Sequence, residues 1–231
     1  MVFIIREIMS FTRQVMAKIA PFMKENGYIQ MNRVFYRIQN DIAYCIGFEM
    51  PNGSLYVWQY ILPLYIPAEF PYLTYGSRLN RMPDVRLSFL DKDADQDEIL
   101  RWCIKLRQQL TEVIFPYFEE ISSPAKLMRF LESWFTMKGK YLYIPPIHFC
   151  RLQLYTHLYL GNIPKVEKVA RKYRRVLKKS TTYTQAAISR DLKEIDAVLS
   201  LLAGSPEELE HFFDETIENT IQCFFAKPHK R

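Results

Sequence analysis

The sequence predicts an α+β fold, in which an N-terminal helix and an antiparallel β-meander with covering helices precede a C-terminal antiparallel helical bundle. Two observations support this class. Residues 28–66 contain short runs with the two-residue period of strands, separated by turn signals. Residues 147–226 instead repeat apolar side chains at helical spacing and are interrupted only by short breaks, which is typical of antiparallel helices. We expect an α+β part at 1–136, a linker at 137–146 and a helical part at 147–231, which packs on the first part or folds independently.

The first expected element is a helix over residues 5–25, where Val15 and Ile19 belong to an apolar series at helical spacing. Pro21 is expected to kink or shorten its last turn. Gly27 suits the left-handed backbone conformation that commonly ends a helix.

Three strands are expected next, at 33–38, 42–50 and 55–66. Asn52-Gly53 lies between the second and the third and is a strong hairpin signal, because both central residues of a type I′ turn have positive φ. The third strand should be central in the sheet, since both of its faces are mostly apolar.

The second strand presents one face of small side chains, Ala43, Cys45 and Gly47. Small residues let a helix or a ligand approach the sheet closely. We favour the first helix as the occupant, because a helix layered on a sheet is the commonest way to bury such a face.

Residues 67–90 are irregular apart from a short strand expected at 85–89, and a helix follows over 95–114 that Phe115-Pro116 should end. Ser123 and Pro124 have the side chains favoured at the N-cap and at the first position of a helix. The last four helices are expected near 146–160, 164–179, 184–203 and 205–225.

The composition is that of a folded protein, with 49% hydrophobic and 24% charged residues. The four cysteines share no CxxC spacing, so we interpret Cys45, Cys103, Cys150 and Cys223 as reduced, mostly buried thiols of a cytoplasmic protein. The apolar run at residues 1–5 is short for a signal peptide, and no run approaches the roughly 20 residues that span a bilayer.

None of the common catalytic motifs occurs: the sequence has no GxSxG, no HExxH, no P-loop and no GxGxxG. His148 and His157 are nine residues apart, which does not place them above one another on a helix as metal ligands. We therefore expect no metal and no cofactor. An enzyme whose carboxylates come together only in the fold stays an alternative.

Several segments follow one another in the order of a bacterial family. The first helix ends in the sequence of residues 21–28, Phe35-Tyr36-Arg37 opens the meander, residues 60–66 close the main strands, and residues 114–122 lead into a helix. Over roughly residues 5–135 the chain resembles the domain-of-unknown-function 4304 family. The resemblance implies an α+β fold and a bacterial origin, and it implies no activity.

The densest local charge lies between Lys165 and Lys179, where eight basic residues and one acid occur in a chain of net charge +6. On a helical projection six cations share one face and apolar side chains share the opposite one. This basic stripe consists of Lys168, Arg171, Lys172, Arg175, Lys178 and Lys179.

Three interpretations of the basic stripe remain: a solvated outer face of a helical bundle, a surface for an acidic protein partner, and a surface for a nucleic-acid backbone. Tyr155, Tyr159 and Tyr183 lie near enough in sequence to stack on bases. A membrane surface is disfavoured, because the small and medium apolar side chains of this helix suit packing on a neighbouring helix.

A second candidate surface is the aromatic row Tyr56, Trp58 and Tyr60, which is either packed in the core or a platform for a peptide or ligand. We predict a non-enzymatic, bacterial, immunity-like or accessory protein that occludes an acidic protein partner, with the basic stripe steering the encounter. The alternatives are nucleic-acid binding through residues 165–179 and an enzyme site between sheet and helices. The sequence determines neither the identity of the partner nor the oligomeric state.

Overall fold

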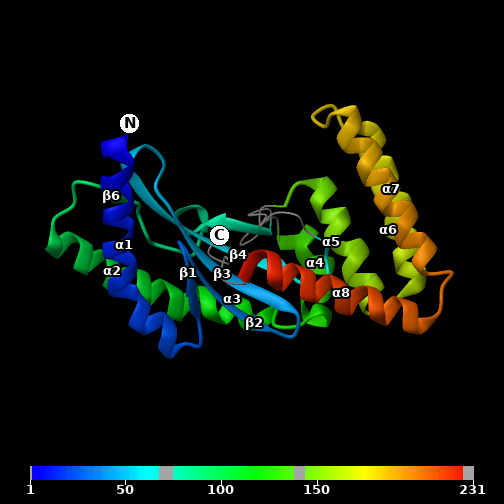
Figure 1. Ribbon diagram of the computed structural model, residues 1–231, viewed down its shortest axis with the longest axis horizontal. Coiled ribbons are helices and arrows are strands. Elements are labelled where there is room, and N and C mark those ends of the chain that lie inside the picture. Colours follow the sequence, from blue (N-terminus) through cyan, green and yellow to red (C-terminus); the bar gives the residue numbers. More distant parts are fainter. Residues whose placement is uncertain (1, 68–74, 138–143, 226–231) are drawn as a thin grey trace.

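The computed structural model describes residues 2–67, 75–137 and 144–225, and it describes side chains over 11–67, 75–132 and 144–225. The first part contains α1 (Val2–Glu25), β1 (Ile29–Met31), β2 (Val34–Gln39), β3 (Ile42–Glu49), β4 (Ser54–Pro63), β5 (Gly76–Arg78), β6 (Leu90–Asp91), α2 (Gln96–Gln109), α3 (Phe115–Glu120) and α4 (Pro124–Met137). The second part contains α5 (Pro146–Tyr159), α6 (Ile163–Lys179), α7 (Gln185–Leu201) and α8 (Pro206–Phe225). The predicted α+β class is confirmed (Figure 1).

The sheet is an antiparallel meander with the order β1-β2-β3-β4-β5, and β6 pairs with the start of β4. β4 has β3 on one side and β5 and β6 on the other, so its predicted central position is confirmed. Asn52 and Gly53 have φ of 55° and 81°, which confirms the turn expected there. Asn40 and Asp41 form a second left-handed turn, with φ of 49° and 60°, between β2 and β3.

The large-residue face of the sheet carries the main core. Tyr44, Ile46 and Phe48 of β3 belong to one buried cluster with Val15 and Ile19 of α1. Burial of side chains this large removes most of their apolar area from water, worth roughly 1.5–3 kcal/mol for each side chain. The first helix therefore covers the face with the large side chains.

The small-residue face is covered by α8, so the expectation that the first helix lies there is wrong. Ala43 and Cys45 of β3 are buried in a second cluster with Phe224, and Phe225 packs its ring 4.3 Å from that of Tyr36. Figure 1 shows α8 running from the helical end of the molecule back across the strands. Small side chains do admit a helix here, but their pattern does not specify which helix arrives.

One expected boundary differs from the structure at the end of α2. The helical segment does not end at Phe115, because a π-helical turn over Leu110–Ile114 connects α2 directly to α3. A π turn widens the helix locally, and Pro116 follows it in the first turn of α3, where a missing N–H is tolerated.

The strand expected at 85–89 is not formed, although Val85 and Leu87 are buried in alternation with exposed neighbours. Side chains of α2 take the backbone groups that a strand partner would use. The Arg86 N–H donates to Gln109 Oε1 at 2.7 Å, and Trp102 Nε1 donates to the Ser88 carbonyl at 2.8 Å.

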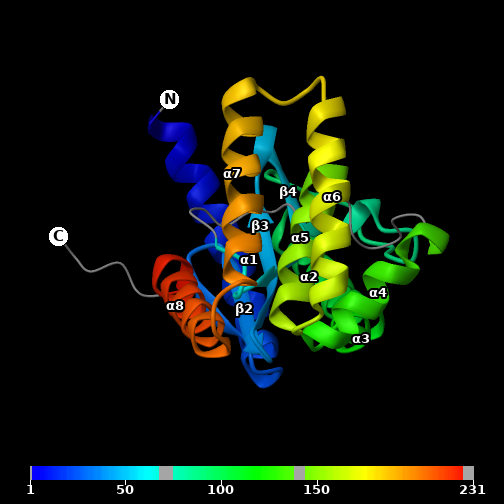
Figure 2. The ribbon, with the colours of Figure 1, turned by 90° about the vertical axis from the view of Figure 1, so that its right-hand side faces the viewer.

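The helical part shares its core with the sheet part. The Tyr65 ring, in the turn after β4, stacks on Tyr159 of α5 with a centroid distance of 4.5 Å, and a hydrogen bond of 3.1 Å joins the hydroxyls of Tyr65 and Thr156. α6 and α7 stand side by side beyond α5 (Figures 1 and 2). Most of the expected linker at 137–146 lies outside the described residues. No described helix is both long and apolar enough to cross a membrane.

Candidate functional site

The basic stripe lies on α6, and the predicted separation of its two faces is confirmed. The buried side consists of Val166, Val169, Ala170, Tyr173 and Leu177, which pack toward α5 and α7. Five of the six cations of the stripe are exposed, and the sixth, Lys172, is half-buried. A 17-residue helix is about 25 Å long, so the stripe extends along one edge of the molecule.

Part of the local positive charge is neutralised within the molecule. Lys165 pairs with Glu132 of α4 at 2.5 Å, and Arg174 pairs with Asp196 of α7. Lys172 Nζ lies 5.1 Å from the centroid of the Phe149 ring. Within the described ranges no ion pair involves the other cations of the stripe, which are Lys168, Arg171, Arg175, Lys178 and Lys179.

A groove of mixed polarity adjoins the basic stripe. It lies between α6 and the end of α7, has a volume of about 590 Å³, and is lined by Ile163, Glu167, Ala170, Arg171, Arg174, Leu199, Leu202 and Ala203. Ile163 is 48% exposed at its edge. The groove therefore places accessible aliphatic surface directly beside Arg171.

The three tyrosines near the stripe are engaged inside the molecule. Tyr155 is only 3% exposed and donates to Glu194 Oε1 at 2.9 Å. Tyr159 donates to Asp41 Oδ2 at 2.7 Å, and Tyr183 shares a hydrogen bond of 2.9 Å with His148 Nε2. The stripe and these rings do not combine into one stacking surface for bases.

The aromatic row divides into a core residue and a capped pair. Tyr60 is 4% exposed and belongs to the cluster beneath α8. Tyr56 and Trp58 are half-buried, and the Arg78 guanidinium lies 4.3 Å and 5.1 Å from their ring centroids. The three rings therefore do not share one exposed face, because Tyr60 is buried and the Arg78 guanidinium lies near the other two.

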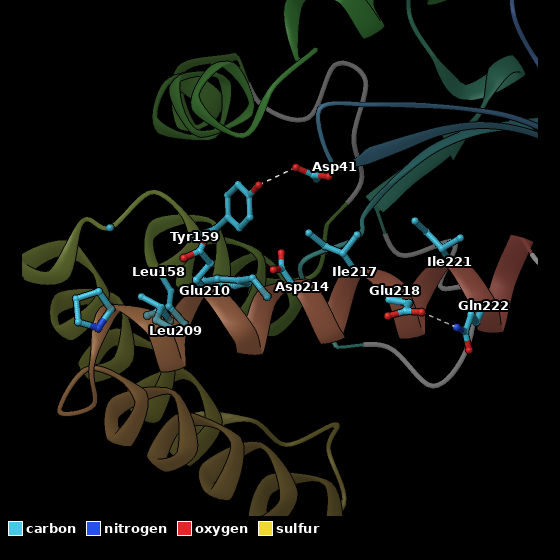
Figure 3. A pocket seen from close by; sticks show the side chains of 13 residues that line it. Asp41, Leu158, Tyr159, Leu209, Glu210, Asp214, Ile217, Glu218, Ile221 and Gln222 are labelled. Carbon is cyan, nitrogen blue, oxygen red and sulfur yellow. Dashed lines mark hydrogen bonds between the residues drawn. The ribbon is translucent and has the colours of Figure 1, made fainter.

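A third surface, which sequence reasoning missed, is a groove along α8 with a volume of about 860 Å³ (Figure 3). Its other wall is formed by the end of α5, the turn after it and Asp41. The lining residues are Asp41, Leu158, Tyr159, Gly161, Pro206, Leu209, Glu210, Phe213, Asp214, Ile217, Glu218, Ile221 and Gln222. The sequence of α8 contains a signal for this groove. Its apolar side chains recur every four residues and form a stripe that is wider than one buried face requires.

Two histidines, the half-buried His148 and the buried His157, have lowered pKa values. Burial, with help from Arg151, lowers the pKa of His148, and burial together with Lys165 lowers the pKa of His157. Across the residues that the structure describes, no three His, Cys, Asp or Glu side chains are placed to hold a metal ion. All four cysteines are free, and only Cys223 is exposed.

Comparison with protein-family models, with curated proteins and with solved structures gives no match, and the resemblance to the domain-of-unknown-function 4304 family stays a prediction.

Proposed function

We propose that this protein is a non-enzymatic interaction factor that binds an acidic protein partner through α6. The observation that supports this function best is the row of five exposed cations that form no ion pair among the described residues and lie beside a groove with aliphatic side chains in its lining. Exposed charges of one sign accelerate the encounter with an oppositely charged partner more than they tighten the final complex. The groove adds the apolar contact that slows dissociation.

The groove favours a protein partner over a nucleic acid. An acidic amphipathic segment places carboxylates against the basic stripe and an aliphatic side chain between Ile163 and Leu202. A phosphate backbone offers the charge without such a side chain. The engaged tyrosines favour the same choice, because single-stranded nucleic acids are held largely by base stacking on accessible rings.

The proposed setting is a bacterial cytoplasm, where an immunity-like or accessory protein would occlude its partner sterically. Four free thiols, three of them buried, suit a reducing compartment.

The test compares a charge-reversed chain with a matched control. In the first variant Lys168, Arg171, Arg175 and Lys179 are changed to Glu. In the control the same reversal is made at exposed cations on other helices, namely Lys24, Arg101, Lys105 and Lys193. Both variants carry the same net charge, so only the position of the charge differs. Proteins captured from lysate with and without nuclease treatment are identified, purified and titrated against all three chains.

We expect a nuclease-resistant partner that the control retains and the stripe variant loses, with an association rate that falls about tenfold or more at low salt. Ile163→Ala should weaken the purified complex by about 1 kcal/mol, mainly through faster dissociation. If capture requires nucleic acid, the basic stripe would instead be assigned to nucleic-acid binding. Equal capture by the two variants would leave the basic stripe as solvated surface.

A further inference from the structure

We propose that the groove along α8 is a second docking site, which binds a basic amphipathic helix of a partner protein. This inference is independent of the function proposed for α6, because it concerns a different surface of opposite charge. It rests on the pattern of side chains along α8, on the charge of the groove and on the fixed position of the opposite wall.

Two parallel rows of side chains run along α8. Leu209, Phe213, Ile217 and Ile221 form an apolar row, and Glu210, Asp214 and Glu218 form an acidic row beside it. Members of each row are four residues apart, which is about 6 Å along a helix. In Figure 3, Asp214, Ile217 and Ile221 point from α8 toward the side of the groove that carries Asp41. The site is therefore an elongated apolar channel, about 18 Å long, with acids along one side.

The charge of the groove is opposite to that of the chain as a whole. Asp41, Glu210, Asp214 and Glu218 bring four carboxylates to it, and none of its 13 lining residues is Lys, Arg or His. The complete chain has a net charge of +6. A negative groove in a positive protein selects cationic ligands and repels acidic ones, including nucleic acid.

The opposite wall is already in place. Asp41 lies in the left-handed turn between β2 and β3, and its carboxylate accepts the hydrogen bond from the Tyr159 hydroxyl. The Tyr159 ring is held in turn by stacking on Tyr65 and by an edge-to-face contact with Phe213, whose ring centroid is 5.0 Å away. A preformed groove avoids the entropy loss of ordering its walls on binding.

A helix matches these features better than other occupants. Ridges of side chains on one helix pack between the rows of another, and apolar residues at three- and four-residue spacing would fill the apolar row while Lys or Arg on the flank reach the acidic row. The basic helix α6 of a second copy of this chain fits the groove less well. Most of its apolar side chains are buried against its own neighbours.

The test uses a designed peptide as the probe. A fluorescent helix of Leu and Lys in an amphipathic order is titrated against the full chain by anisotropy, next to two controls. One control has the same composition in scrambled order, and the other has Glu in place of every Lys. We expect binding of the first peptide alone, weakening as salt is raised.

Substitutions then locate the site. Glu210→Gln, Asp214→Asn and Glu218→Gln together should weaken binding about tenfold or more. A matched control carries Glu25→Gln, Asp97→Asn and Glu120→Gln, three exposed acids outside the groove, and it should bind as the parent does. The α6 charge-reversal variant should also bind the Leu/Lys peptide normally, which separates this inference from the function proposed above.

Three results would overturn the proposal. These are similar binding of the scrambled peptide, equal weakening by the two sets of acid substitutions, and absence of binding. Sedimentation of the protein alone provides a further check, since self-association that the groove substitutions abolish would assign the groove to a second copy of the chain.

Discussion

At the scale of single residues, one ion pair, Arg151 with Glu194, joins three segments of the chain. Glu194 of α7 accepts hydrogen bonds from Arg151 Nε and Nη2 of α5, at 2.8 and 2.6 Å, and from the Tyr155 hydroxyl at 2.9 Å. Arg151 Nη2 also donates to the Pro67 carbonyl at 2.6 Å. The side chains of Arg151 and Glu194 are 17% and 18% exposed, so the pair is largely removed from water.

Breaking this pair on one side should be strongly destabilising. Glu194→Gln leaves the Arg151 guanidinium buried without a counter-charge, and we expect the unfolding free energy to fall by about 3 kcal/mol. Replacing both residues by Met should bring the stability back to within about 1 kcal/mol of the parent. Arg174→Ala is the control, because its pair with Asp196 is 40% and 65% exposed and should contribute about 0.5 kcal/mol or less. Urea unfolding measures all four; equal losses in Glu194→Gln and Arg174→Ala would contradict the expectation.

At the scale of elements, periodicity and turn chemistry predicted most of the secondary structure. The left-handed turn at Asn52-Gly53 and the four C-terminal helices follow from side-chain pattern, which is local information. The strand expected at 85–89 fails for a reason no local pattern contains. Its backbone groups bond to Gln109 and Trp102, which are distant in sequence. Tertiary packing, rather than local sequence, likewise decides that α8 and not α1 covers the small-residue face.

The position of α8 can be tested through Cys45, which it covers. Burial raises the pKa of the Cys45 thiol to about 12, so the thiol should react only when α8 opens. In a Cys223→Ser background, Phe224→Ala should lower the opening free energy by about 3 kcal/mol and accelerate labelling of Cys45 about a hundredfold.

Cys103 is the internal control in the same experiment. It is 1% exposed and packs in the main core, away from Phe224. Peptide mapping of the labelled chain should show acceleration at Cys45 and little change at Cys103. Equal acceleration of both thiols would mean that the substitution loosens the whole molecule rather than α8.

At the scale of the whole molecule, the fold places opposite charges on two helices of the same half. The basic stripe was predictable, because all of its cations lie within one helix of 17 residues. The α8 groove was not, because its walls come from the β2–β3 turn, α5 and α8, whose approach depends on packing. A surface within one element can be recognised from sequence, whereas a site between elements requires the fold.

Whole-molecule stability should depend on pH through two histidines, the half-buried His148 and the buried His157. His148 faces Arg151, Arg190 and Asp191, His157 faces Lys165 and Glu132, and in both cases burial is the main cause of a lowered pKa. Near the ordinary histidine pKa of about 6.5 the unfolded chain therefore binds more protons than the folded one. The histidine contribution to stability is complete above about pH 6.5 and decreases as the pH falls below that value.

Unfolding free energies measured from about pH 7 to about pH 5 should therefore decrease toward acid. Replacing His148 by Gln and His157 by Leu should flatten this decrease, because the substituted side chains take up no proton on unfolding. His211→Gln is the control, since His211 lies on the exposed surface of α8, and its slope is compared with that of the double variant. If the double variant kept the parent slope, the acid sensitivity would arise from carboxylates, and these two histidines would have no part in it.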